Sequence, residues 1–234
     1  MTNIDYEDYL KTLNEISRAI TSDLYLEDIL KLIVTLTANV MKAKVCNVWL
    51  IDEKKQEFNI KATQSMHQEY LKKRTIKLNE GIVGLVAREK KPKIIFDVLK
   101  DEQYKEKNLA IKEGLVSMAS IPMMVKNEVI GVLNVYTNKY YEFTTSEITL
   151  LSTIANQAAV AIEKTELIVK TKIIQEELDA RKKIERAKGI LMEERNINEN
   201  EAFVLIRKSS MDKRISMKDI AEAIILSDEI RQIK

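Results

Sequence analysis

Basic side chains cluster in two short segments of the last third of the sequence, and closely spaced cations are well suited to bind a phosphate backbone. The first segment contains Arg181, Lys182, Lys183, Arg186 and Lys188. The second segment contains Arg207, Lys208, Lys213, Arg214 and Lys218. Asp212 is the only acid within the second segment. The clusters suggest contact with nucleic acid, although a helix face that simply contacts solvent shows the same charges.

Acidic residues concentrate outside these clusters, so charge is segregated along the C-terminal region. The acids form two groups, which are Glu193, Glu194, Glu199 and Glu201, then Asp219, Glu222, Asp228 and Glu229. The whole chain has 38 lysines and arginines against 36 aspartates and glutamates, a net charge of +2. Net charge therefore identifies no partner, and binding to nucleic acid must come from the local clusters.

Residues that perform covalent chemistry are scarce. Cys46 is the only cysteine and His67 the only histidine among 234 residues. One thiol cannot form an internal disulfide, and one thiol with one imidazole cannot form a cysteine-rich or histidine-rich metal site. Most catalytic triads are also hard to assemble from these two residues. No glycine-rich loop that could hold a nucleotide phosphate is present. We therefore expect no enzyme activity, no metal and no cofactor, and we expect Cys46 to be a buried structural thiol.

The N-terminal residues predict no export or membrane insertion. The sequence begins MTNIDYEDYLKTLNE, which is acidic and polar and lacks the basic and apolar regions of a signal peptide. The longest apolar candidate, 29–40, is interrupted by Lys31, Thr35, Thr37 and Asn39. It falls short of the ~20 apolar residues that a membrane span needs. We therefore expect a cytoplasmic protein without membrane contact, and a single cysteine suits that reducing compartment.

The hydrophobic pattern of the first 136 residues changes from a helical to a strand period. Helical spacing predicts helices over 5–20, 24–41 and 82–88. Alternation predicts strands over 44–51, 57–63, 75–78, 93–98, 116–125 and 129–136. Val45, Asn47 and Trp49 should face one side of their strand, with Cys46 and Val48 on the other.

From Phe143 onward the pattern is helical, and Thr144 or Thr145 is a suitable start. No glycine or proline occurs from Phe143 to Lys188. Apolar and small residues recur three and four apart at Leu151, Ile154, Ala158, Ala161, Thr165 and Ile168. The seam weakens at Lys172 and partly resumes at Ile174, Leu178 and Ile184. This spacing predicts a long, coiled-coil-like connector helix over 144–190 that pairs with its twin in a homodimer. Two helices separated by a kink are the alternative.

Three short helices follow from the C-terminal pattern. Ile184, Ala187 and Leu191 form one apolar stripe. Asn198 with Glu201, and Ser216 with Asp219, have the spacing of helix-capping pairs. Apolar residues on the two following helices, Ala202, Phe203, Leu205 and Ile206 and then Ile220, Ala221, Ile224 and Ile225, should face a shared core. Gly189 weakens a helix, and close approach between helices would explain it.

The same C-terminal region resembles the ANTAR family over residues 170–232. The resemblance is carried by Ala187-Lys188-Gly189-Ile190-Leu191-Met192, by Glu201-Ala202-Phe203, by Ser210-Met211, and by Asp219-Ile220-Ala221 followed by Ile224. It implies an all-α, three-helix RNA-binding domain. ANTAR proteins bind paired hairpins in nascent mRNA leaders and so prevent a terminator from forming. The resemblance therefore implies a signal-responsive transcription antiterminator.

The resemblance turns the two basic clusters into RNA contacts. The residues expected to contact phosphate are Arg186, Lys188, Arg207, Lys208, Lys213 and Arg214. Ser209 and Ser210 are expected to donate hydrogen bonds nearby, and Ser210 could equally cap the end of its helix. Phe203 falls in the predicted core stripe, so the sequence indicates no aromatic residue for base stacking.

The region 10–165 resembles a GAF sensor domain. Three stretches carry the resemblance, EGIVGLVAREKKPKIIFDV, VSMASIPMMVKNEVIGVLNVY and FTTSEITLLSTIANQAAVAIE. The family implies an antiparallel sheet flanked by helices, with a pocket for a small-molecule effector. By analogy, Phe96, Asp97, Ser117 and Ala119 are candidates for the pocket wall, or else ordinary core and turn residues.

Known GAF chemistries match the sequence incompletely. The cyclic-nucleotide pattern begins with Asn138, Lys139 and Phe143, but Glu147 and Ile148 replace its final Asp-Glu pair. Reduction of free methionine sulfoxide uses more than one cysteine, and this chain has one. These departures argue against cyclic-nucleotide binding and against that enzyme activity.

Together these features predict an α+β protein with a GAF-like domain over 1–165, a shared connector helix over 144–190 and an ANTAR-like domain over 170–232. The expected partner is a two-hairpin leader RNA. Two alternatives use the same C-terminal helices. One is a DNA-binding regulator with a helix-turn-helix, and the other is an adaptor that binds proteins.

Overall fold

The computed structural model of the chain describes residues 6–65 and 74–232, and His67 lies outside these ranges. The chain divides into two compact units, Met1–Thr165 and Glu166–Lys234. Each unit has its own hydrophobic core. Among the described residues, no helix combines the length and the apolar character needed to cross a membrane.

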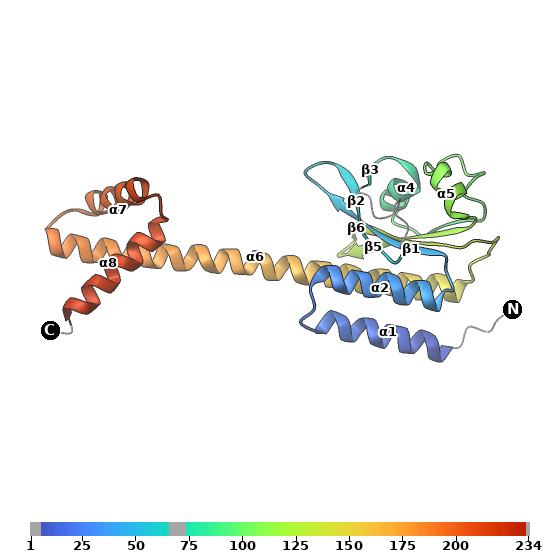
Figure 1. Cartoon of the computed structure of the whole chain (residues 1–234), viewed down its shortest axis with the longest axis horizontal. Helices are drawn as coiled ribbons and strands as arrows, with labels where there is room; N and C mark the ends of the chain where they lie inside the picture. The colour runs from blue at the N-terminus through green and yellow to red at the C-terminus, as the bar shows by residue number, and fades with distance from the viewer. Residues whose placement is uncertain (1–5, 66–73, 233–234) are drawn as a thin grey trace. The chain divides into compact units, whose positions relative to one another are not determined.

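The N-terminal unit is an α+β fold built on one antiparallel sheet of six strands (Figure 1). Its described helices are α1 (Tyr6–Thr21), α2 (Leu26–Val40), α4 (Gly81–Glu89), α5 (Lys107–Glu113) and the first part of α6 (Thr145–Arg195). Its strands are β1 (Val45–Asp52), β2 (Glu57–Thr63), β3 (Thr75–Lys77), β4 (Lys93–Ile95), β5 (Met118–Val125) and β6 (Glu128–Tyr136). The strand order is β3-β2-β1-β6-β5-β4.

Both faces of this sheet are buried, because each is covered by helices (Figure 1). Cys46 and Val48 pack in an apolar cluster with residues of α1, α2 and the long helix α6 (Thr145–Arg195). Val45 and Trp49 pack in a second cluster with residues of α4 and α5. The predicted alternation along β1 is therefore confirmed, and Cys46 is a buried free thiol.

Two glycines of the N-terminal unit are required by close backbone approaches. A Cβ at Gly131 would lie 2.3 Å from the carbonyl oxygen of Trp49 on the neighbouring strand. A Cβ at Gly84 would lie 2.4 Å from the carbonyl oxygen of Leu78. No side chain tolerates such contacts, so these glycines allow β6 and α4 to pack as they do.

The long helix α6 spans Thr145–Arg195 without a break, 51 residues in all. Its start is a reciprocal cap, in which Glu147 N donates to Thr144 Oγ1 and Thr144 N donates to a Glu147 carboxylate oxygen. Leu151, Ile154 and Ala158 are fully buried in the first apolar cluster. The predicted seam is therefore wrong over 151–161, because these residues pack on the chain's own sheet rather than on a twin helix.

The end of α6 packs with α7 (Glu199–Lys213) and α8 (Met217–Gln232) to form the three-helix C-terminal unit. Its core contains Ala187, Leu191, Ala202, Ile206, Ile220, Ala221 and Ile225. Asn198 and Glu201 form the predicted capping box of α7. The Ser216 hydroxyl and the Asp219 carboxylate cap the start of α8 in the same way.

Two sequence interpretations of this unit are wrong. Phe203 is 40% exposed, because Ala202 and Ile206 take the inward positions of α7 and position 203 lies one residue off that stripe. Gly189 is not explained by close helix packing, since an added Cβ there would find no described atom within 4 Å beyond the adjoining backbone of its own helix.

Candidate nucleic-acid interface

The first basic cluster is largely neutralised by acids of its own unit. Lys183 Nζ lies 2.6 Å from Glu222 Oε1, and Arg186 Nη2 lies 2.9 Å from Glu229 Oε1. Both ion pairs join α6 to α8. Acids that lie apart in the sequence, Glu222 and Glu229, are thus partners of the first cluster, and these ion pairs bridge α6 and α8.

Lys188 is the most enclosed cation of the unit, with 7% of its surface exposed. Its Nζ lies 2.8 Å from Glu185 Oε2 and 2.6 Å from Glu199 Oε1, so it joins α6 to the start of α7. Hydrogen bonds to Glu185 and Glu199 raise the pKa of Lys188. The same contact from Lys188 lowers the pKa of Glu199. Lys188 therefore lies at the junction of α6 and α7, and its contact with phosphate stays a prediction.

The second basic cluster has a different environment. Arg207, Lys208, Lys213 and Arg214 are exposed. None of them forms an ion pair within the described part of the C-terminal unit. Arg214 ends α7 in the left-handed conformation, with φ of 56°. The four cations therefore lie on the second half of α7 and its terminus, where positive charge also suits the helix dipole.

The two serines that precede this terminus play different parts. Ser210 Oγ donates to the carbonyl oxygen of Ile215 at 2.6 Å, so it fastens the turn that follows α7. Ser209 is half-buried and lines a groove between α6, α7 and α8. Only Ser209 thus offers a hydroxyl whose donor is not committed within the described structure.

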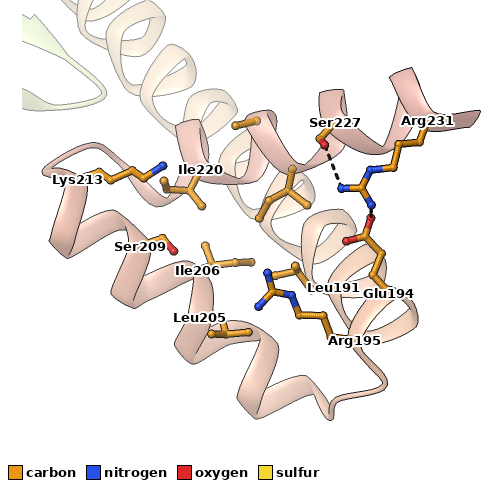
Figure 2. Close-up of a pocket in the computed structure, with 12 residues that line it drawn as sticks. Leu191, Glu194, Arg195, Leu205, Ile206, Ser209, Lys213, Ile220, Ser227 and Arg231 are labelled. Carbon is orange, nitrogen blue, oxygen red and sulfur yellow. Dashed lines mark hydrogen bonds and ion pairs between the residues drawn. The ribbon is translucent and has the colours of Figure 1, made fainter.

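That groove encloses about 290 Å³ and is formed by the three helices of the C-terminal unit (Figure 2). Its apolar lining comes from Leu191, Leu205, Ile206, Ile220, Ala223 and Ile224. Its polar lining comes from Glu194, Arg195, Ser209, Lys213, Ser227 and Arg231. The sequence does not indicate the groove or the part of Arg195 in it. The hollow exists only where three helices pack together, and Arg195 is the last residue of one of them.

The four candidates for an effector pocket lie in two different surroundings. Phe96 is 51% exposed and stacks on Tyr140 with ring centroids 5.0 Å apart. Asp97 accepts from Leu99 N, and Ser117 Oγ donates to the Phe96 carbonyl oxygen at 2.6 Å. Ala119 is fully buried in the first apolar cluster, under α1 and α2. Phe96, Asp97 and Ser117 thus form a local turn network, and Ala119 is a core residue.

Buried polar groups instead lie on the sheet face that α4 and α5 cover. Asn134 is paired across the sheet with Asn47 on β1 and with Ser120 on β5, so the three side chains share this face. Ser120 Oγ donates to Asn134 Oδ1 at 2.7 Å. Among the described residues, Asn47 Oδ1, Asn134 Nδ2 and Trp49 Nε1 have no hydrogen-bond partner.

Such orphaned atoms are uncommon in a protein interior and call for an explanation. The sequence signal that could have found them is a single asparagine within each of two otherwise apolar strands.

A charged pair lies beside this face. Arg74 Nη1 lies 2.6 Å from Glu106 Oε1, and its guanidinium carbon lies 5.4 Å from the centre of the Trp49 ring. Arg74 and Glu106 also line a hollow of about 270 Å³ with Asn108, Leu109 and Lys112. Burial raises the pKa of Glu106, and Arg74 opposes this shift. The α5 side of the sheet therefore combines apolar surface, uncommitted polar atoms and a cation.

Comparisons with known proteins match both units. The GAF domain family matches residues 24–163, more than half of the chain, and the ANTAR domain family matches residues 173–225. The chain is 28% identical over 158 residues to a protein of Escherichia coli named "Phosphoenolpyruvate-dependent phosphotransferase system", covering 68% of this chain and 21% of that protein. It is 40% identical over 52 residues to the transcriptional regulatory protein PdtaR of Mycobacterium tuberculosis, covering 22% of this chain and 25% of that protein.

Solved structures resemble the N-terminal unit. The GAF domain of a phosphoenolpyruvate-protein phosphotransferase from Coxiella burnetii has a TM-score of 0.66 and 24% identity, covering 72% of this chain and 99% of that one. The corresponding Acinetobacter domain has a TM-score of 0.61 and 26% identity, covering 73% and 99%. The chain thus spans about a fifth of the length of the phosphotransferase relatives and a quarter of PdtaR.

Proposed function

The chain belongs to the GAF domain family and carries a C-terminal ANTAR domain, and on that premise we propose that it is a signal-responsive, RNA-binding transcription antiterminator. It binds paired hairpins in nascent mRNA leaders and prevents terminator formation, which places its action in the cytoplasm. The observation that carries the proposal is the exposed group of cations without ion-pair partners at the end of α7, within the ANTAR match.

The proposed RNA contacts follow from which cations are free to neutralise a phosphate. Arg207, Lys208, Lys213 and Arg214 bind the backbone, and Ser209 lies beside them. Lys188 positions α7 against α6 through Glu185 and Glu199 instead. Arg186 is exposed but paired with Glu229, so it contributes to RNA binding only if that ion pair opens.

RNA binding is tested with full-length protein and a labelled two-hairpin RNA. Arg207→Glu should weaken binding strongly, since it replaces a phosphate contact with a repulsive charge. Lys54→Glu, an exposed charge reversal in the N-terminal unit outside the hollow beside α5, is the matched control and should leave binding unchanged. Equal binding by wild type and Arg207→Glu would remove this surface from the proposal.

We also propose that the working unit is a homodimer that pairs through α6. Val160, Leu167, Ile174 and Leu178 are all 45% or more exposed. Their spacing of seven, seven and four residues is that of a coiled-coil stripe. This stripe differs from the 151–161 residues used by the chain's own core. Leu167→Glu should shift the mass measured by light scattering from dimer to monomer, whereas Val169→Glu, at a 52% exposed position on the opposite face of α6, should not.

The effector of the GAF unit is proposed to bind on the α5 side of the sheet. The unpartnered polar atoms of Asn47, Trp49 and Asn134 support this assignment, because a ligand with donors and acceptors would satisfy them. The helix α6 contributes residues to the cores of both units, so a change in sheet packing can bias the RNA-binding helices.

A DNA-binding regulator is the second candidate, since α7 and α8 are consecutive short helices joined by a tight turn. Competition between duplex DNA and two-hairpin RNA at one salt concentration separates the two functions. Displacement of the RNA by equimolar duplex DNA would favour the DNA reading.

A further inference from the structure

The groove of the C-terminal unit has an apolar floor and a basic rim. Leu205 of α7 and Ile224 of α8 are the half-buried apolar residues of its lining, whereas Ile206 and Ile220 (Figure 2) belong to the buried core. Ser209 contributes a hydroxyl from α7, and Ser227 contributes one from α8. A hollow of about 290 Å³ lies at the small end of the range for ligand sites, which suits one flat ring system.

The rim is electrostatically asymmetric. Lys213 lies near the turn between α7 and α8, and Arg195 lies away from that turn, beside Leu191 and Ile206 (Figure 2). Neither cation has an ion-pair partner within residues 74–232. Glu194 is the one acid of the lining, and its carboxylate is paired with the Arg231 guanidinium, which also donates to Ser227 Oγ at 3.2 Å. The opening is therefore positive.

We propose that this groove receives one unstacked nucleobase from an RNA loop, while the flanking phosphates contact Lys213 and Arg195. The inference rests on the proposed function and adds where the loop sequence is read. The accessible apolar side chains of the floor, Leu205 and Ile224, contact the face of the base, and the hydroxyls of Ser209 and Ser227 pair with its edge. Single-stranded loops are the part of RNA in which bases are free to leave the stack.

Charge favours RNA over a protein ligand. An apolar helix from a partner or from a second copy would cover the floor but leave Arg195 and Lys213 facing it without counter-charge. A nucleotide supplies both an apolar face and the phosphates. The groove is also continuous with the proposed phosphate surface, since Lys213 belongs to both.

The experiment uses full-length protein and hairpin RNAs selected from a pool with randomised loops. Loop preference is the affinity for a selected RNA divided by the affinity for the same RNA with its loop scrambled. Ala223→Trp fills the groove from an exposed position of α8 and changes no charge. Ile230→Trp is the matched control, because Ile230 is 58% exposed on the same helix and does not line the groove.

We expect Ala223→Trp to lower loop preference about tenfold, the range for losing one base contact. Its affinity for the scrambled RNA should stay unchanged, since phosphate contacts dominate that binding. Ile230→Trp should preserve both quantities. Unchanged loop preference in Ala223→Trp overturns the groove assignment and leaves RNA binding standing. Failure of the wild type to bind any hairpin RNA overturns the proposed function as well.

A second measurement uses only the wild-type protein, so it does not depend on the folding of any variant. The fluorescent base 2-aminopurine is placed at successive loop positions of the selected RNA and bound to wild-type protein. A fluorescence change confined to one loop position supports the capture of one base. Equal responses at all loop positions would overturn it.

Discussion

Replacing single cations of the C-terminal unit by glutamine should change the salt dependence of RNA binding according to whether each cation is free. Arg207, Lys208, Lys213 and Arg214 are exposed and outside every described ion pair of the unit. Each phosphate neutralised on a single strand contributes about 0.7 to the slope of log affinity against log salt. Four contacts then give a slope of about −2.8 per protomer, so a fourfold rise in salt weakens binding about 50-fold.

Lys208→Gln should reduce this slope by about 0.7. Lys183→Gln should leave the slope unchanged, because the Lys183 ammonium already lies 2.6 Å from Glu222 and must lose that partner before it can meet a phosphate. Fluorescence anisotropy of a labelled two-hairpin RNA, titrated across a series of KCl concentrations, measures both slopes. The reasoning is refuted if Lys183→Gln and Lys208→Gln flatten the slope equally.

Three further outcomes are expected. Ile206→Ala should destabilise the C-terminal unit by about 2–5 kcal/mol, since Ile206 is 1% exposed in its core; an unshifted urea midpoint would contradict this. Glu199→Gln should destabilise the protein at neutral pH and lose its effect in acid. The hydrogen bond from Lys188 lowers the pKa of Glu199, so its stabilisation is present above the ordinary glutamate pKa of about 4.3 and lost as pH falls through the lowered value. Urea unfolding of both proteins across that pH range checks the sign. Asn47→Leu should keep or raise the thermal midpoint, because a buried acceptor without a partner costs about 1–3 kcal/mol; a lower midpoint would show that Asn47 stabilises the unoccupied fold.

The sequence predicted those features that depend on local chemistry. The capping pairs Asn198–Glu201 and Ser216–Asp219 are confirmed, because a cap is fixed by residues three apart. The strand alternation around Trp49 is also confirmed, because it depends only on neighbouring residues of one strand. The α+β class, the antiparallel sheet and the long helix are also as expected.

The features that were missed depend on which surfaces meet in three dimensions. A helical stripe has the same appearance whether it packs on its own sheet or on a twin helix, which is why the 151–161 seam was misassigned. The ion pair of Lys188 with Glu199 has no sequence signal, because its partner belongs to another helix. The groove between α6, α7 and α8 has no sequence pattern at all, since its walls come from three separate segments.

Gly189 makes α6 less stable than alanine would at the same position. Its added Cβ would meet no described atom beyond the adjoining backbone of its own helix, so alanine would fit without strain and would favour the helix by about 1 kcal/mol. A residue that weakens its own helix without easing any internal contact is typical of a balance between folding and activity. For protein engineering, position 189 is therefore both an accessible stabilising change and a marker of a surface where bare backbone is available to an approaching molecule.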